Sequence, residues 1–206
     1  MNALNQGNLH LVSDNLDPLE PACRDLLRVA TQGPHERLHL HAGFSAGKDG
    51  TITRASYRAL LIRLYGFYLP FEQAIGMEPI RAQWLEKDLL WLGVGTGAFP
   101  HLRLCANVPA YDCLERKLGA LYVAEGSALG GRTLCRGLDA LLGSDSIEGR
   151  RFFSGRGPDT GSAWLGFLDQ LASVGHAPIG RAALLSGAVE TFEVFEIWLS
   201  AWGETK

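Results

Sequence analysis

The sequence has few of the features that mark extracellular, membrane or nucleic-acid-binding proteins. It contains only four cysteines, Cys23, Cys105, Cys113 and Cys135, with no CxxC pair and no framework spacing. Such cysteines are typical of reduced, mostly buried thiols in the cytosol. No apolar run reaches the roughly 18–20 residues that a membrane-spanning helix needs, and no basic block indicates a nucleic-acid partner. We therefore expect a cytoplasmic protein that binds neither membrane nor nucleic acid.

The chain also lacks any sign of division into several domains. Residues 1–18 are polar and have neither the basic nor the apolar region of a secretion signal, so we expect a flexible N-terminal tail. Residues 19–206 contain no internal repeat and no linker, and 47% of the whole chain is hydrophobic. We expect this part to form one domain with a sizeable core.

Apolar residues recur at spacings of three and four, and strict alternation is nearly absent. This pattern predicts a single all-α domain of about six to eight helices. Loops are expected over 43–50, 93–109 (with room for one helical turn) and 143–161. Helices are expected over 21–41 with a kink or break just before His35, 51–71 with a bend or end at Pro70, 80–93, 111–142, 162–174 and 179–202.

The expected helix over 111–142 is unusually rich in glycine, at Gly119, Gly126, Gly130, Gly131 and Gly137. An interior glycine costs a helix roughly 1 kcal/mol relative to alanine. Gly126 and Gly130 are four residues apart and therefore share one face of the helix. Either a flat ligand presses on this bare strip or a second helix packs closely there, and the helix alone leaves both interpretations open.

The segment His35-Glu36-Arg37-Leu38-His39 is compatible with two chemistries. On a helix, His35 and His39 lie on one face and could hold zinc, with Glu36 as the general base of a hydrolase. That interpretation needs a third ligand, and no second motif presents one. Alternatively, one neutral histidine binds haem iron and leaves the opposite coordination position open for oxygen. Both histidines could also be ordinary hydrogen-bonded residues.

Taken together, these segments resemble the biliverdin-producing haem oxygenases of bacteria. The segment from Arg28 through Thr31 to His35 resembles the family's basic residue, threonine and proximal histidine. The resemblance implies that His35 binds the iron and that Arg28 meets a haem propionate. A second segment, Leu121-Tyr122-Val123-Ala124-Glu125-Gly126-Ser127-Ala128-Leu129-Gly130-Gly131, resembles the glycine-rich distal helix.

Two further features extend the resemblance. Phe152-Phe153, followed by Gly155, Gly157, Thr160-Gly161 and Trp164, is similar to enzymes found beside bacterial phytochromes, and the last helix places two phenylalanines where a haem edge would lie. The implied catalytic residues are Gly126, Ser127 and Gly130. The implied haem-binding residues are His35, Arg28, Thr31, Tyr122, Gly131, Arg132, Arg136, Phe192 and Phe195, of which Arg132 and Arg136 could equally belong to a solvated helix face.

The resemblance implies an all-α fold with haem b held between the first, proximal helix and the distal helix. Haem would be both substrate and cofactor, and O2 with external electrons would open it to biliverdin, carbon monoxide and free iron. The implied electron donor is a ferredoxin or a flavoprotein reductase. A bacteriophytochrome is the implied acceptor of biliverdin.

The sequence departs from the family pattern at two positions. Ser127 stands where many members carry an aspartate that orders water near bound oxygen, and His39 stands where a carboxylate is common. A serine hydroxyl still donates and accepts hydrogen bonds but adds no charge. A non-catalytic haem carrier or sensor on the same scaffold therefore stays open as an alternative.

Overall fold

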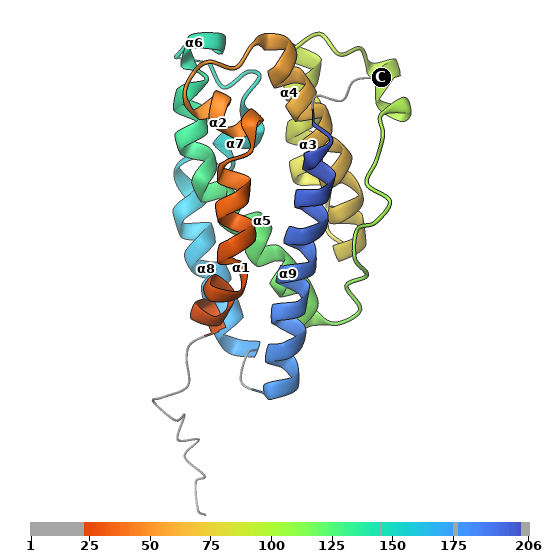
Figure 1. The fold of residues 1–206 in the computed structure, drawn as a ribbon, viewed down its shortest axis with the longest axis vertical. Coiled ribbons are helices and arrows are strands. Elements are labelled where there is room, and N and C mark those ends of the chain that lie inside the picture. Colours follow the sequence, from red (N-terminus) through yellow and green to blue (C-terminus); the bar gives the residue numbers. More distant parts are fainter. Residues whose placement is uncertain (1–22, 145, 175–176, 203–206) are drawn as a thin grey trace, which may run out of the picture.

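The structure is a computed structural model that describes residues 23–144, 146–174 and 177–202, except for the side chain of Arg132. The expected tail over 1–18 lies outside the described residues. The described chain is helical and contains no strand, which confirms the all-α prediction (Figure 1). Its elements are α1 (Cys23–His39), α2 (Ala42–Lys48), α3 (Arg54–Ile75), α4 (Ile80–Trp91), η1 (Thr96–His101), α5 (Leu114–Gly137), α6 (Asp139–Leu142), α7 (Arg151–Ser154), η2 (Gly157–Asp159), α8 (Thr160–Val174) and α9 (Pro178–Ser200).

A break before His35 and a helix end at Pro70, which were among the expected alternatives, do not occur, because both prolines lie inside continuous helices. α1 runs through Pro34 to His39, and α3 runs through Pro70 to Ile75. Both helices bury one face along most of their length, and this packing outweighs the lost backbone hydrogen bond. As a result, His35 and His39 share one uninterrupted helical face.

The stretches 43–50 and 143–161 are more helical than their glycine content indicates. The first contains α2, and the N-cap residue His41, just before the helix, accepts a hydrogen bond from the Gly43 N–H at 3.2 Å through Nδ1. Gly43 and Gly47 are buried where neighbouring side chains approach closely, so tertiary contacts override their low helix propensity. The second stretch contains α7 and η2.

α5 is the central element of the fold. Figure 1 shows α1 and α9 in front of α5, and α9 packs against both α5 and α1. The α5–α9 crossing is very close, because the α-carbons of Gly119 and Gly187 face the carbonyls of Leu184 and Arg116 on the opposite helix. None of the described helices is both long and apolar enough to cross a membrane.

Enlarging Gly119 is expected to destabilise the protein. A methyl group there would overlap with the backbone carbonyl of Leu184, which cannot rotate away. Overpacking of this kind costs roughly 1–3 kcal/mol, so Gly119→Ala should lower the free energy of unfolding measured in urea by about that amount. Gly166→Ala on α8 is the control, because no atom lies within 4 Å of the added methyl. Equal urea midpoints for Gly119→Ala and the wild type would contradict the close crossing.

Candidate active site

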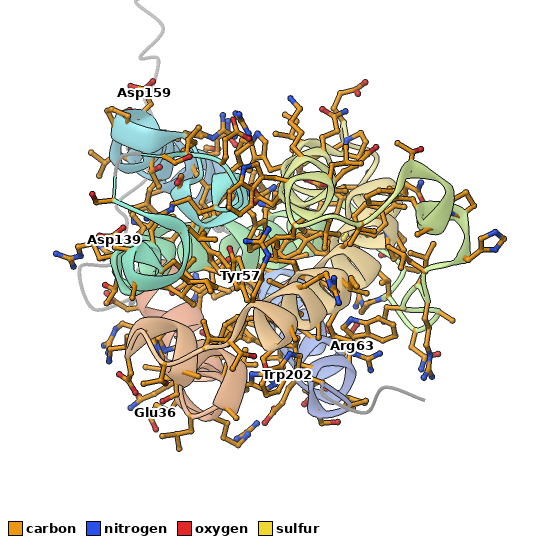
Figure 2. All side chains as sticks on the ribbon, turned by 90° about the horizontal axis from the view of Figure 1, so that it is seen from above. Glu36, Tyr57, Arg63, Asp139, Asp159 and Trp202 are labelled. Atoms are coloured by element: carbon orange, nitrogen blue, oxygen red, sulfur yellow. The ribbon has the colours of Figure 1, made fainter. Side chains whose placement is uncertain are left out.

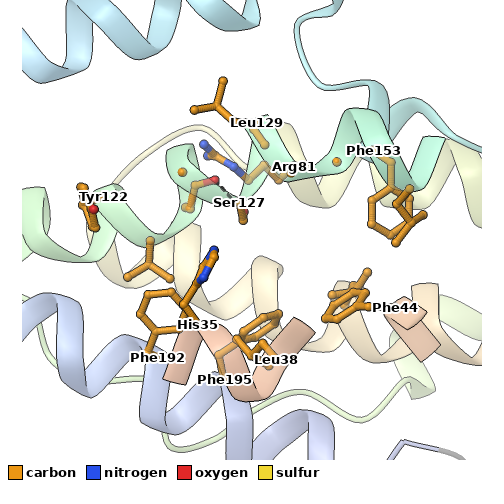
Figure 3. A pocket seen from close by; sticks show the side chains of 18 of the residues that line it. His35, Leu38, Phe44, Arg81, Tyr122, Ser127, Leu129, Phe153, Phe192 and Phe195 are labelled. Atoms are coloured by element: carbon orange, nitrogen blue, oxygen red, sulfur yellow. Dashed lines mark hydrogen bonds between the residues drawn. The ribbon is translucent and has the colours of Figure 1, made fainter. Parts of the chain in front are cut away.

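A cavity of about 530 Å³ lies between α1 and α2 on one side and α5 on the other. This volume falls within the roughly 300–1,000 Å³ of small-molecule sites. Figure 3 shows α5 along one wall, with side chains of α1, α2 and α9 facing it. Most of the lining is apolar and aromatic, and includes Leu38, Phe44, Phe67, Phe71, Phe152, Phe153, Trp164, Phe192 and Phe195.

The glycines of α5 fall into two groups according to what each α-carbon faces. At Gly130 an added Cβ would meet no atom within 4 Å, and at Gly126 it would meet only the Trp164 ring at 3.9 Å. At Gly119, Gly131 and Gly137 it would overlap with the backbone of another helix. Close packing therefore explains three of the glycines, but not the strip formed by Gly126 and Gly130, which borders the cavity. Gly131 also borders the cavity, but its α-carbon packs on the Phe153 carbonyl.

His35 faces the glycine strip across the cavity. In Figure 3 its imidazole extends from α1 toward the segment of α5 that carries Ser127. The ring lies edge-on to Phe192, with centroids 6.4 Å apart, and its Nε2 lies 3.3 Å from Nε2 of His39. Burial, followed by the charge of His39, lowers the pKa of His35, and Glu36 opposes this in part. The neutral imidazole favoured by this environment is the form that binds metal.

The described residues do not support a zinc site. They contain no group of three or more His, Cys, Asp and Glu side chains that could hold a metal ion. Glu36 accepts a hydrogen bond from Gln32 at 2.8 Å, and Figure 2 shows it on the outside of the molecule. The HExxH hydrolase interpretation therefore has neither a third ligand nor a base inside the cavity.

One end of the cavity brings together Arg28, Thr31 and Tyr122, three of the residues that were expected to bind haem. Thr31 is buried and donates a hydrogen bond to the Leu27 carbonyl at 2.7 Å. Burial raises the pKa of Tyr122, and the charge of Arg28 is among the factors that oppose the rise. Arg28 is largely exposed and pairs only loosely with Asp25, at 3.9 Å. Its guanidinium is thus available to an anionic group at this mouth of the cavity.

The opposite end contains a cation that the sequence did not reveal. Lys48 on α2 lines the cavity, together with Phe44 from the same helix. Lys48 was not predicted as a cavity residue, because the stretch 43–50 was expected to be a loop.

The other residues expected to bind haem differ in their position relative to the cavity. Arg136 is exposed and does not line the cavity, and the side chain of Arg132 is outside the described part of the chain. Phe192 and Phe195 are buried against the cavity.

Asp88 positions the aromatic residues of α7 at this site. Its carboxylate is fully buried on α4 and accepts the backbone N–H groups of Arg151 at 2.8 Å and Phe152 at 2.9 Å. These bonds anchor the first turn of α7, which carries Phe152 and Phe153 into the lining. Burial is the largest influence on the carboxyl and raises its pKa to about 6.

We expect Asp88 to make stability depend on pH between about 4 and 6. Because the folded state holds this proton more tightly than the unfolded state, ionisation of Asp88 lowers stability as pH rises from 3.8 toward about 6. Asn does not ionise, so Asp88→Asn removes this pH dependence. As pH rises over this window, the free energy of unfolding of the wild type should fall relative to that of the variant by on the order of 3 kcal/mol. Urea titrations at several pH values measure the difference, and a constant difference would contradict the assignment.

The fold and the site define an all-helical protein whose cavity suits a flat, apolar ligand held by a histidine. A profile of the heme oxygenase family matches residues 22–201, and the chain belongs to that family. The family catalyses ring opening of haem, which is both its substrate and its iron-bearing cofactor.

Solved structures of other proteins share the fold, among them two heme oxygenases. The heme oxygenase from Leptospira interrogans superposes with a TM-score of 0.73 at 16% identity, over 87% of this chain and 99% of that one. The heme oxygenase-1 from the cyanobacterium Synechocystis, in complex with heme, superposes with a TM-score of 0.69 at 19% identity, over 89% of this chain and 93% of that one. A search of curated proteins found no match.

Proposed function

We propose that this protein binds haem b in the cavity between α1 and α5, with His35 on the iron, and opens the ring there to biliverdin, carbon monoxide and free iron. The observation that carries the proposal is the position of His35 opposite Gly126 and Gly130. The Cβ positions of these glycines meet either open space or a ring at contact distance. A flat ring bound by His35 would therefore lie against bare helix backbone.

The residues around the cavity fit haem in size, polarity and charge. Apolar and aromatic side chains suit the ring, and the propionates, which leave one edge of it, would meet a cation at either mouth of the cavity: Arg28 at one end or Lys48 at the other. When bound, haem supplies an iron centre whose remaining coordination position accepts O2. Gly126 and Gly130 leave space for O2 beside α5, and the buried rings of Phe192 and Phe195 keep bulk water from the opposite face.

Ser127 is the polar side chain of α5 that is best placed to assist the chemistry. Its hydroxyl donates to the Ala124 carbonyl at 2.8 Å and lies 3.4 Å from the Tyr68 hydroxyl. A hydroxyl has two acceptor lone pairs besides its proton, so Ser127 retains the capacity to bind water in the cavity. We infer that it orders such water without contributing charge.

The partners follow from the reaction and from the sequence resemblance. Ring opening consumes external electrons, for which we propose a ferredoxin or a flavoprotein reductase as donor. The resemblance of the segment from Phe152 to Trp164 is the support for a bacteriophytochrome as acceptor of biliverdin. We also propose that the enzyme works in the cytosol, where its four free thiols would stay reduced.

Visible spectroscopy of the purified protein with haemin tests the function. We expect a Soret band on binding, and its replacement by the absorbance of biliverdin after ascorbate or a ferredoxin system is added in air. A Soret band that persists through reduction would identify a haem carrier or sensor instead of an oxygenase. A Soret band that stays the same as that of free haemin would refute haem binding.

A further inference from the structure

The two histidines of α1 that line the large cavity bring their imidazole rings together. Nε2 of His35 lies 3.3 Å from Nε2 of His39, and the ring centroids are 4.4 Å apart. Both side chains are exposed, and Figure 3 shows the ring of His35 extending into the cavity. Two N–H groups would repel each other at this distance, so at least one of the two nitrogens presents a lone pair to its neighbour.

The distance between the two nitrogens is that of two ligands on one metal ion. Imidazole nitrogens bind zinc at about 2.0–2.1 Å in a tetrahedral arrangement, which places neighbouring nitrogens about 3.3–3.4 Å apart. Histidines four residues apart on a helix recur as metal ligands, because they share one face. Small rotations of the exposed rings would turn both lone pairs toward a single ion without any change in the backbone.

The charges around the pair favour a cation. Glu36 follows His35 in α1 and acts on it through its charge. Glu36 accepts a hydrogen bond from the amide of Gln32, which is neutral and leaves the charge of the carboxylate uncompensated. The next residue, Arg37, is held by Glu196 of α9, whose carboxylate accepts from Nη2 at 2.8 Å. The positive charge of Arg37 is therefore balanced, and the negative charge of Glu36 is left to attract a cation.

Two imidazoles make an open site, not a closed one. A resident zinc ion needs three or four protein ligands, and the described residues do not bring that many together. With half of the four ligands of a structural zinc site, the pair should bind a divalent ion with a dissociation constant of about 1–100 µM. Water would fill the remaining positions. Such a site takes up an ion that is delivered to it and later releases it.

We propose that His35 and His39 together form a site for a divalent transition-metal ion in the haem-free cavity, and that its occupant is the ferrous iron set free by ring opening. The identity of the ion rests on the proposed function, because that reaction releases iron beside His35. The ion keeps its bond to His35 and exchanges the nitrogens of the opened ring for His39 and water. Protons from solvent replace it on the product, and no electron moves in the exchange.

Haem and this ion exclude each other, because both need Nε2 of His35. Binding of Co²⁺ to the haem-free, untagged full chain tests the site, since imidazole binds Co²⁺ and its visible spectrum responds to its ligands. His35→Ala and His39→Ala should each weaken Co²⁺ binding by roughly 100-fold, because the ion then loses one of its two imidazoles. His101→Ala is the matched control and should bind Co²⁺ like the wild type, because His101 is also exposed but does not line the cavity. Equal Co²⁺ affinity in all three variants would overturn the site.

Competition with haemin tests the shared ligand. Co²⁺ at about ten times its dissociation constant should lower the apparent haemin affinity of the wild type by roughly tenfold, and should leave that of His39→Ala nearly unchanged. A haemin affinity that does not respond to Co²⁺ in the wild type would overturn the proposal that the ion binds His35.

Competition with Fe²⁺ tests the identity of the occupant. Without oxygen, an excess of Fe²⁺ should displace Co²⁺ from the wild type, and an excess is needed because such sites prefer Co²⁺ to Fe²⁺. Co²⁺ that Fe²⁺ cannot displace would overturn iron as the occupant. A wild-type protein that binds Co²⁺ through both histidines but forms no haemin complex would refute the proposed function and still support the metal site.

Discussion

His35→Ala should abolish the histidine-ligated spectrum of the ferric haemin complex and reduce ring opening by roughly 100-fold or more, as expected when a group at the reacting centre is lost. His35 is the imidazole that faces the glycine strip, and its environment favours the neutral form that binds iron. Addition of free imidazole should restore part of the spectrum, since the cavity itself is kept.

His39→Ala is the matched control for this prediction. Both histidines border the cavity and their Nε2 atoms lie 3.3 Å apart, so the two variants remove the same group from adjacent turns of α1. We expect His39→Ala to keep the spectrum and most of the turnover. The opposite result, with the spectrum lost in His39→Ala and kept in His35→Ala, would assign the iron to His39.

Gly130→Leu and Gly126→Leu should each weaken haemin binding by about 10- to 100-fold, because a side chain would then project from the strip into the space for the ring. That range corresponds to the roughly 1–3 kcal/mol of an overpacked site. Gly130 is the sharper test, since its surroundings are open to 4 Å and the folded apoprotein should tolerate the change. Haemin titration followed at the Soret band measures the affinity.

Gly166→Leu separates the loss of space from the loss of a helical glycine. Gly166 lies on α8, also has no atom within 4 Å of an added Cβ, and does not border the cavity. This variant should bind haemin like the wild type. If Gly126→Leu and Gly130→Leu also bind and turn over haemin normally, the strip has no role in holding the ligand.

The features that could be predicted from the sequence are local ones. Apolar spacing predicts most of the helices, because a helix repeats every 3.6 residues and buries one side. His35 and the Gly126–Gly130 strip can likewise be recognised in the sequence, because each depends only on residues within one or two turns of the same helix. The role of each glycine could not be predicted in this way, because Gly119 and Gly130 are both helical glycines in the sequence. Only the surrounding structure shows that Gly119 packs against another helix and that Gly130 faces open space.

The features that were missed depend on contacts between distant segments. α2 forms because Gly43 and Gly47 pack closely against side chains such as Leu60 and Leu134, and these contacts outweigh the low helix propensity of the two glycines. The place of Lys48 in the cavity lining depends on this helix and was therefore not predicted. Arg81 lines the large cavity from α4, where it is held between Glu72 and Glu125, and nothing in the segment around it indicates a buried cation.

A crystal structure of the ferric haemin complex tests the central claim most directly. The account predicts that the ring lies between α1 and α5, with the iron bound by Nε2 of His35 and the opposite face against the backbone of Gly126 and Gly130. Iron bound by another residue, or a ring held outside this cavity, would contradict it.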